Sequence, residues 1–317
     1  MNYSDLICPE NLFQAWNEFK KGKTKRSDVQ LFDMHLEDNL FNLHLSLQNK
    51  TYAHGPYASF YVTDPKLRHI HKASVADRIV HHMLYKYLYA LFDKNFIFDS
   101  YSCRVEKGTH RGVRRLSAIA RKVSRNYTGQ CWALKCDIKK FFASIDHQIL
   151  FDLLVRKISD ENIMWLISQV IDSFPMGLPL GNVTSQVMAN IFLNELDKFI
   201  KHNLKIKYYL RYADDFIILD NRKDKLELLI EPVSAFLNQN LKLELHPKKV
   251  FFRKLEWGID FLGYIILPHY LLPRTKTKRR IFRKLEQKSL QSYLGYLSHA
   301  NSYKLQQELK NKVYLLK

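Results

Sequence analysis

Three aspartates are the residues whose type and setting point most directly to chemistry. Asp137 ends a short, mostly apolar run, while Asp214 and Asp215 lie between two apolar-aromatic runs. If the first run is a strand and the other two form a hairpin beside it, the three carboxylates meet at one end of a sheet. Their mutual repulsion would then require a nearby cation. The sequence therefore predicts a cation site built from acids.

Carboxylate oxygens, together with substrate phosphates, are the usual ligands of Mg²⁺ in proteins. Two such ions can activate an attacking hydroxyl and stabilise the leaving oxygen of an in-line displacement. The predicted reaction class is phosphoryl or nucleotidyl transfer. The alternative is that Asp214-Asp215 occupies a plain surface turn, since aspartate tolerates tight turns. The strongly apolar flanks favour the end of a buried hairpin.

The elements that would position these acids follow from the spacing of apolar residues. A strand is expected at 132–138 and a hairpin at 207–211 and 216–219, with Tyr212-Ala-Asp-Asp215 at its tip. Helical spacing is expected at 76–92, 145–158, 184–203 and 226–237, and residues 11–50 also suit helices. Further extended segments are predicted at 52–71, as a short hairpin, and at 241–245 and 259–267.

Composition limits the partners. The 317 residues carry 50 Lys and Arg against 31 Asp and Glu, a formal net charge of +19. This excess predicts a polyanionic partner, and nucleic acid is favoured because no apolar run approaches the ~20 residues that span a bilayer. From Arg274 onwards there are 12 Lys and Arg and 2 Asp and Glu. We expect no membrane partner, a cytoplasmic location, and structural roles for the four unpatterned cysteines.

Five segments carry a resemblance to a known family in their order along the chain. They are Cys136-Asp-Ile-Lys-Lys-Phe-Phe142, Gly177-Leu-Pro-Leu-Gly-Asn-Val-Thr-Ser-Gln186, Arg211-Tyr-Ala-Asp-Asp215, Leu243-Glu-Leu-His-Pro-Lys-Lys249 and Gly258-Ile-Asp-Phe-Leu-Gly-Tyr264. This series resembles motifs A to E of reverse transcriptases. Upstream, Pro65-Lys-Leu-Arg68, Asp77-Arg78, Tyr101-Ser-Cys-Arg104 and Gly108-Thr-His110 resemble the fingers motifs of bacterial enzymes related to group II intron reverse transcriptases.

The resemblance implies roles for individual residues. Asp137 and Asp214 would ligate two Mg²⁺ ions, for which Mn²⁺ could substitute, with the Ile138 carbonyl assisting and Asp215 completing the catalytic acids. Nucleotide-binding residues would follow from motif position: Arg68, Phe141, Phe142, Leu180, Gly181, Gln186 and Lys249.

Several of these roles have chemical reasons and plainer alternatives. Arg68 could fork to two phosphate oxygens, or form a surface ion pair. Phe142 matches the aromatic that blocks a ribose 2′-hydroxyl, although packing in the core would also explain it. Lys249 matches a motif D lysine that donates a proton to pyrophosphate, and the neighbouring Lys248 leaves that choice open.

Two further sets would contact nucleic acid. Leu262, Gly263 and Tyr264 match the primer grip, where glycine lets a backbone approach closely, and an ordinary hairpin strand is the alternative. In the basic C-terminal segment, Lys278, Arg279, Arg280 and Arg283 would track a nucleic-acid backbone.

Motif B indicates a subclass. Relatives of the group II intron type mostly read Q-G-x-x-x-S-P, whereas this chain reads Leu180-Gly181-Asn-Val-Thr-Ser185-Gln186. This departure resembles reverse transcriptases of diversity-generating retroelements. That likeness implies copying of a template-repeat RNA into cDNA from a primer and deoxynucleoside triphosphates, misincorporation opposite adenine, and a small basic accessory variability protein, itself an oligomer.

The resemblance implies an α+β right-hand polymerase fold, with fingers, a palm of antiparallel sheet and helices, and a small helical thumb. The expected domains are an N-terminal helical extension (1–50), fingers with part of the palm (51–130), a palm carrying motifs A to E (131–267) and a basic helical thumb (268–317). Two rivals remain: a retron or phage-defence reverse transcriptase, and a catalytically silent RNA-binding scaffold.

Overall fold

The chain passes several times between two compact units in a computed structural model that describes residues 1–64 and 66–314. Unit 1 comprises 1–97, 139–199 and 236–244, and unit 2 comprises 98–138, 200–235 and 245–317. Pro65 of the predicted fingers motif and the last three residues of the predicted thumb lie outside the described residues. The division into fingers, palm and thumb stays a prediction.

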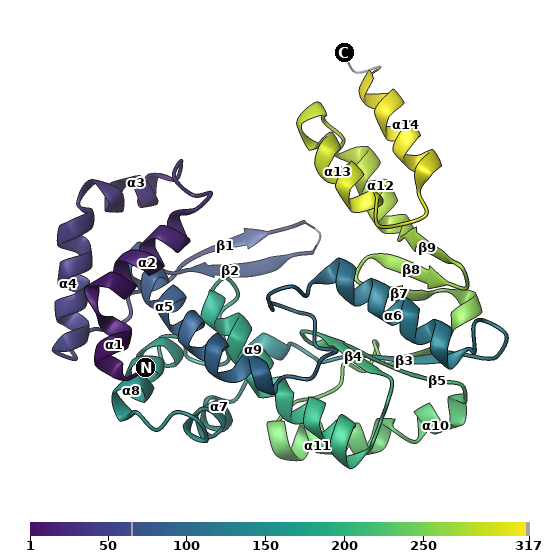
Figure 1. Ribbon diagram of the computed structural model, residues 1–317, viewed down its shortest axis with the longest axis horizontal. Coiled ribbons are helices and arrows are strands. Elements are labelled where there is room, and N and C mark those ends of the chain that lie inside the picture. The colour runs from purple at the N-terminus through teal and green to yellow at the C-terminus, as the bar shows by residue number, and fades with distance from the viewer. Residues whose placement is uncertain (65, 315–317) are drawn as a thin grey trace. The chain divides into compact units, whose positions relative to one another are not determined.

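Unit 1 is mainly helical (Figure 1). Its α-helices are α1 (Tyr3–Ile7), α2 (Pro9–Lys20), α3 (Ser27–Met34), α4 (Leu36–Gln48), α5 (Val75–Phe92), α7 (His147–Val155), α8 (Glu161–Ile171) and α9 (Val183–Lys198). Short 3₁₀ turns occur at Asp93–Asn95 and Phe141–Ser144. The helices expected at 76–92, 145–158 and 184–203 are therefore confirmed within a few residues, and α9 continues as a π-helix at Phe199–Asn203.

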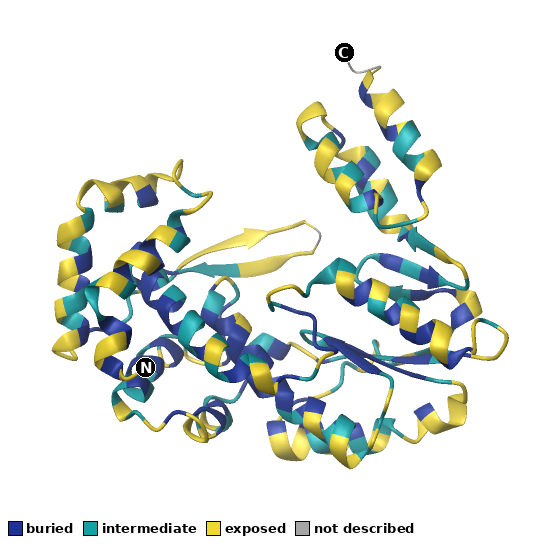
Figure 2. Ribbon diagram, viewed as in Figure 1, coloured by how far each residue is buried: buried dark blue, intermediate teal, exposed yellow. Residues whose placement is uncertain are grey.

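Helix α5 shows why these segments are helical. Ser74 caps its N-terminus by accepting the N–H of Asp77, and apolar residues at three- and four-residue steps form its buried side. That side packs against α2 and α9. Helix α9 is buried almost all round, so its start is held firmly within unit 1. The expected hairpin is present as β1 (Ala58–Val62) and β2 (Arg68–Lys72), and Figure 2 shows it largely exposed.

Unit 2 is built around a four-stranded antiparallel sheet in the order β4-β5-β3-β6. Its strands are β3 (Trp132–Asp137), β4 (Tyr209–Tyr212), β5 (Asp215–Asp220) and β6 (Phe251–Lys254). Helix α6 (Thr109–Val123) covers one face, and α10 (Lys223–Glu227) contacts β3 and β5 on the other (Figure 1). The strands β3 to β5 are mostly buried, as Figure 2 shows, so this sheet is the core of the unit.

The rest of unit 2 follows the sheet along the chain. A three-stranded antiparallel sheet contains β7 (Ile259–Phe261), β8 (Tyr264–Leu267) and β9 (Tyr270–Pro273). Helices α12 (Thr275–Arg283), α13 (Leu290–Leu297) and α14 (Tyr303–Tyr314) then share a small apolar core of their own. The expected extended segment at 259–267 is thus a hairpin, and the basic C-terminal segment is helical.

Two expectations are wrong. The strand predicted at 241–245 does not form, because helix α11 (Ile230–Leu241) runs to Leu241 and Lys242 turns with a φ of 53°. The N–H of Leu243 then bonds back to Leu237 at 2.9 Å, so it caps the helix, and Leu245 makes an isolated bridge with Ile138 but no strand. The single helix predicted around 226–237 is two helices, α10 and α11. Helix α6 and strand β6 were not predicted.

Candidate active site

Antiparallel pairing brings the predicted acids to one end of the sheet in unit 2. Asp137, the last residue of β3, is the direct partner of Asp215, the first residue of β5. Asp214 lies in the two-residue turn between β4 and β5, and its carbonyl accepts the N–H of Ile138 at 3.3 Å. The expected meeting of strand end and hairpin tip is therefore present in the backbone.

The hairpin tip is held in an unusual conformation. Ala213 has a φ of 52°, a left-handed value that costs a non-glycine residue about 1–2 kcal/mol. The buried guanidinium of Arg211 donates to the Ala213 carbonyl at 3.2 Å. The N–H of Arg211 donates to the Asp99 carbonyl, while its own carbonyl accepts the N–H of Tyr101. These bonds anchor the strand that carries the tip, so the positions of the aspartates are well defined.

Two lysines pair with the aspartates. Lys249 donates to Asp137 Oδ1 at 2.7 Å, and Lys135 Nζ lies 3.1 Å from Asp215 Oδ2. Lys248 is exposed, and its N–H bonds to the ring of His246. The structure therefore brings Lys249, and not Lys248, to the acids. His246 explains this choice, because its N–H bonds to the Asp137 carbonyl and fixes the segment before Lys249 on the end of β3.

The Asp215 carboxyl is electrostatically unusual. Burial raises its pKa to about 6; the Lys135 ammonium opposes this shift, and the Asp137 and Asp214 carboxylates add to it. Its Oδ1 atom is buried without a hydrogen-bond partner. A buried oxygen in that condition, among other carboxylates, fits a site for a hard divalent cation. The oxygen donors predicted from the sequence are therefore suitable ligands.

In the arrangement seen, however, the counter-charge comes from lysines. Within residues 1–64 and 66–314, no set of three or more His, Cys, Asp or Glu side chains is gathered in a way that could hold a metal ion. Asp137 and Asp215 each face an ammonium group instead.

The same described ranges contain no helix long and apolar enough to cross a bilayer.

The residues expected to bind nucleotide lie in unit 1, apart from Lys249. Arg68 is exposed at the start of β2, and Gln186 is exposed on α9. Phe142 is half-buried, whereas only 2% of Phe141 is exposed, so of these two rings only Phe142 presents appreciable surface. Leu180 is also half-buried and lies three residues before Val183, the first residue of α9.

The loop from Leu180 to Asn182 is attached to the β1–β2 hairpin. The Leu180 carbonyl accepts the N–H of His71 at 2.8 Å, and the Asn182 side chain donates to the Tyr57 hydroxyl at 2.9 Å. Gly181 has a φ of 132°, and a Cβ there would lie 2.5 Å from the His71 carbonyl oxygen. Only glycine therefore permits this close approach between the loop and β2.

A buried histidine holds the first turn of α9. His81 Nδ1 lies 2.6 Å from the Thr184 hydroxyl, and its Nε2 lies 3.1 Å from His54 Nε2. Burial of the imidazole lowers the pKa of His81 to about 3. The ring is therefore neutral near pH 7, and its hydrogen bond with Thr184 links α5 to the first turn of α9.

The predicted primer grip is a tight turn between β7 and β8. Leu262 and Gly263 have φ values of 48° and 91°, as a two-residue hairpin loop requires. The Gly263 carbonyl accepts the Tyr296 hydroxyl at 2.8 Å, and the rings of Tyr264 and Tyr296 stack. The turn is thus secured against α13, while its contact with a primer stays a prediction.

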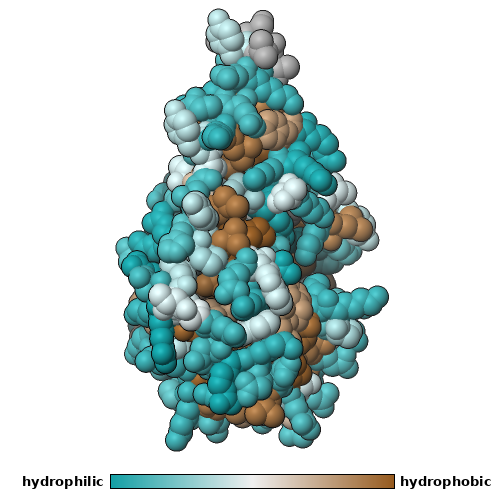
Figure 3. Space-filling model, turned by 90° about the vertical axis from the view of Figure 1, so that its right-hand side faces the viewer, coloured by the Kyte–Doolittle hydropathy of each residue, from teal (hydrophilic) through white to brown (hydrophobic). Residues whose placement is uncertain are grey.

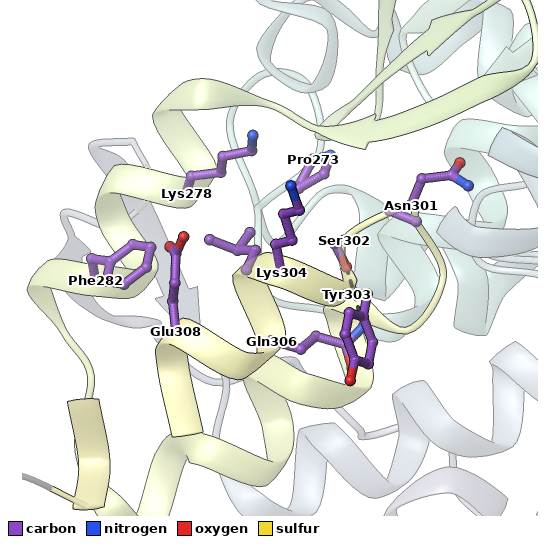
Figure 4. Close-up of a pocket in the computed structure, with 11 residues that line it drawn as sticks. Pro273, Lys278, Phe282, Asn301, Ser302, Tyr303, Lys304, Gln306 and Glu308 are labelled. Atoms are coloured by element: carbon purple, nitrogen blue, oxygen red, sulfur yellow. Dashed lines mark hydrogen bonds between the residues drawn. The ribbon is translucent and has the colours of Figure 1, made fainter. Parts of the chain in front are cut away.

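The C-terminal helices carry the predicted backbone-contacting cations. On α12, Arg279 and Arg283 are exposed, and Lys278 and Arg280 are half-buried. Lys278 and Lys304 of α14 line a pocket of about 820 Å³, which Figure 4 shows together with Glu308. Figure 3 shows one face of the molecule, on which hydrophilic side chains predominate.

Three contributors to these arrangements were not predicted from the sequence: Lys135, Arg211 and His81. A signal exists for the first two, because a cation inside an apolar strand needs a buried partner. His81 carries no comparable signal, since a histidine on an apolar helix face can equally well be a plain core residue.

Comparisons with known proteins agree on one family. A family model described as reverse transcriptase (RNA-dependent DNA polymerase) matches residues 63–266. Escherichia coli protein YkfC is 25% identical over 247 residues, which cover 64% of each chain. The group II intron-encoded protein LtrA of Lactococcus lactis is 23% identical, covering 83% of this chain and 56% of LtrA. The chain thus spans less than two thirds of the length of either relative.

Two further similarities add detail. The retron Ec73 reverse transcriptase of Escherichia coli is 31% identical over 111 residues, covering 31% of this chain and 35% of the retron protein. Among solved structures, apo telomerase from Candida tropicalis, truncated from its C-terminal domain, matches with a TM-score of 0.54 and 14% identity. That match covers 75% of this chain and 60% of the telomerase chain. This likeness concerns the fold alone.

Proposed function

This chain belongs to the reverse transcriptase (RNA-dependent DNA polymerase) family, and we propose that it extends a DNA primer by copying an RNA template. Its fold is the α+β right-hand polymerase fold that the sequence motifs predicted. The observation that carries the proposal is the acidic end of the sheet in unit 2, where Asp137 and Asp215 are direct strand partners and Asp214 lies in the adjoining turn.

The roles of the residues follow from this arrangement. Asp137 and Asp214 would hold two Mg²⁺ ions, with Mn²⁺ as a substitute, assisted by the Ile138 carbonyl and Asp215. When bound, the ions would activate a primer 3′-hydroxyl and neutralise charge on the departing pyrophosphate. Lys249 already lies on Asp137, and in the reaction its Nζ would give a proton to the pyrophosphate. Arg68, with its planar guanidinium, would hold the triphosphate.

The residues near α9 would select the nucleotide. Phe142 would contact the sugar and exclude a 2′-hydroxyl. The Leu180–Gly181 loop and Gln186 would border the incoming base pair. Leu262, Gly263 and Tyr264 would support the primer, and the cations of α12 would follow the nucleic-acid backbone.

A substitution pair tests the polymerase proposal. Asp137→Asn or Asp214→Asn keeps the side-chain shape but removes an anionic ligand, so primer extension with Mg²⁺ should be abolished while the thermal midpoint is retained. Asp220→Asn is the matched control, since it makes the same change at the opposite end of β5. Near-normal extension by either site variant, with a wild-type thermal midpoint, would remove the catalytic assignment. A wild-type protein that binds RNA without extending primers would favour a silent scaffold.

At a finer level, we propose that the chain is a reverse transcriptase of the diversity-generating retroelement type. It would copy a template-repeat RNA with errors opposite adenine and work with a small basic accessory variability protein. The support is the motif B sequence, with Leu180 before Gly181 and Gln186 after Ser185. The group II intron and retron relatives keep other bacterial reverse transcriptases as the alternative.

Leu180 supplies the test of this finer proposal. A glutamine there could hydrogen-bond the sugar or its surroundings, and one such bond is worth on the order of 0.5–1.5 kcal/mol, a several-fold to roughly tenfold change in discrimination. Leu180→Gln should therefore lower misincorporation opposite template adenine and leave correct extension largely intact. The measurement is sequencing of cDNA made from one adenine-containing template at matched total synthesis. Equal adenine-specific error frequencies would refute the fidelity role, and sequencing of RNA that copurifies with the protein would identify its template.

A further inference from the structure

Lys135 occupies an unusual position for a charged residue. It lies inside β3, with only 13% of its side chain exposed. Its Nζ is 3.1 Å from Asp215 Oδ2 and also donates to the Asp260 carbonyl at 3.1 Å. The same ammonium lies 5.7 Å from the centroid of the Phe261 ring. Lys135 therefore joins the acidic end of one sheet to β7, a strand of the other sheet.

The contacts continue beyond β7. The Asp260 carboxylate forms an ion pair with the guanidinium of Arg274, the residue that immediately precedes α12. The N–H of Arg274 donates to the Gly263 carbonyl at 2.9 Å, the same oxygen that accepts the Tyr296 hydroxyl. Direct contacts thus lead from Asp215 through Lys135 and Asp260 to the Leu262–Gly263 turn.

Charge neutralisation alone does not account for this geometry. A lysine that only balanced Asp215 could keep its ammonium toward solvent, as long charged side chains commonly do. Here the ammonium is enclosed and bonded to a backbone carbonyl of β7. Burying it is costly unless each bond is formed, so the bond to Asp260 restrains the distance between the two sheets.

We propose that Lys135 is a positioning residue that keeps the Asp215 carboxylate and the Leu262–Gly263 turn at a set separation. This inference rests on the proposed function, in which the acids hold the reacting groups and the turn supports the primer end. A set separation between them would place the primer terminus at the acids in each cycle of addition. Asp260 and Arg274 extend the same restraint to the start of α12.

The first test needs no activity. Hydrogen exchange of the 317-residue chain is followed in peptides covering residues 259–266, for the wild type and for Lys135→Met, whose unbranched side chain ends at Cε and lacks the ammonium group. We expect exchange there to be faster in Lys135→Met, by on the order of tenfold, the loss expected for a hydrogen bond to a charged group. Lys254→Met is the matched control, because Lys254 lies in β6 of the same sheet and pairs with Glu256.

A second variant guards against a folding defect. Lys135→Met leaves Asp215 without its cation, whereas the double variant Lys135→Met/Asp215→Asn removes both charges. Exchange across 259–266 should remain fast in the double variant and should return toward the wild-type rate in Lys135→Arg, which keeps a positive charge and N–H donors. Wild-type exchange at 259–266 in the double variant would overturn the proposal, whether or not the protein proves to be a polymerase.

The second test concerns primer use. In primer extension, Lys135→Met should raise the KM for primer–template on the order of tenfold, and Asp260→Asn should raise it by less. The KM of the double variant should be no higher than that of Lys135→Met alone, because both changes interrupt the same series of contacts. Additive effects would overturn the proposed coupling. Absence of extension by the wild-type protein would instead refute the proposed function and leave the exchange result standing.

Discussion

Replacing Gly181 by alanine tests how the loop before α9 is held. The new Cβ would lie 2.5 Å from the His71 carbonyl oxygen and 3.3 Å from the Ile70 side chain. The oxygen belongs to the backbone of β2, whose residue His71 is paired with Ser59, so it cannot swing aside as a flexible side chain would. We expect the loop to withdraw and to break the bond between His71 and Leu180.

The magnitude follows from three contributions. A φ of 132° is unfavourable for alanine and costs about 1–3 kcal/mol. The hydrogen bond from His71 to Leu180 contributes about 1 kcal/mol. Alanine also restricts the unfolded chain more than glycine does, and this stabilises the folded variant by about 0.4–1 kcal/mol. These contributions sum to a loss of about 1–3.5 kcal/mol, which in a chain of 317 residues lowers the thermal midpoint by roughly 2–5 °C.

Scanning calorimetry with a matched glycine control measures this effect. Gly295 lies within α13, and a Cβ there would meet no atom within 4 Å. Gly295→Ala should therefore leave the midpoint unchanged or raise it, since alanine is favoured over glycine in a helix by roughly 0.5–1 kcal/mol. Gly181→Ala should also lower nucleotide addition more than it lowers RNA binding. An unchanged midpoint in Gly181→Ala would refute the argument that the loop and β2 cannot separate at low cost.

Two further predictions concern pH and salt. Because burial lowers the pKa of His81 to about 3, the unfolded chain binds a proton below pH 6.5 that the folded chain does not. The free energy of unfolding should therefore fall as the pH decreases, with a contribution from His81 of up to ~1.4 kcal/mol per pH unit. Urea unfolding between pH 7 and 5 should show a weaker pH dependence of this free energy in His81→Gln than in the wild type. Equal pH dependence in the two proteins would contradict the prediction. For α12, RNA affinity should fall with salt at a log–log slope of about −0.7 to −0.9 per phosphate neutralised. Neutralising Lys278, Arg279, Arg280 and Arg283 together should reduce that slope, and an unchanged slope would reassign these cations to packing or protein contact.

Much of the fold could be predicted because its information is local. The apolar spacing of α5 and α9, and the paired runs of β4 and β5 with acids between them, are patterns within about twenty residues. The order of the five motifs was sufficient to predict the family. The predicted strand at 241–245 is wrong because the N–H of Leu243 bonds back to Leu237 of α11. Leu245 forms only an isolated bridge with Ile138, and the strands that pair with β3 are β5 and β6.

The sequence by itself determined which residues could do chemistry: three acids beside apolar runs, a glycine before a long helix and a basic C-terminal segment. Only the tertiary structure decided their partners. It set Lys249 rather than Lys248 on Asp137, buried Lys135 between Asp215 and Asp260, and brought Gly181 against His71. Each of these contacts joins residues that are far apart in the chain. Which distant groups meet depends on strand register and helix packing, and those are properties of the whole fold that local spacing does not contain.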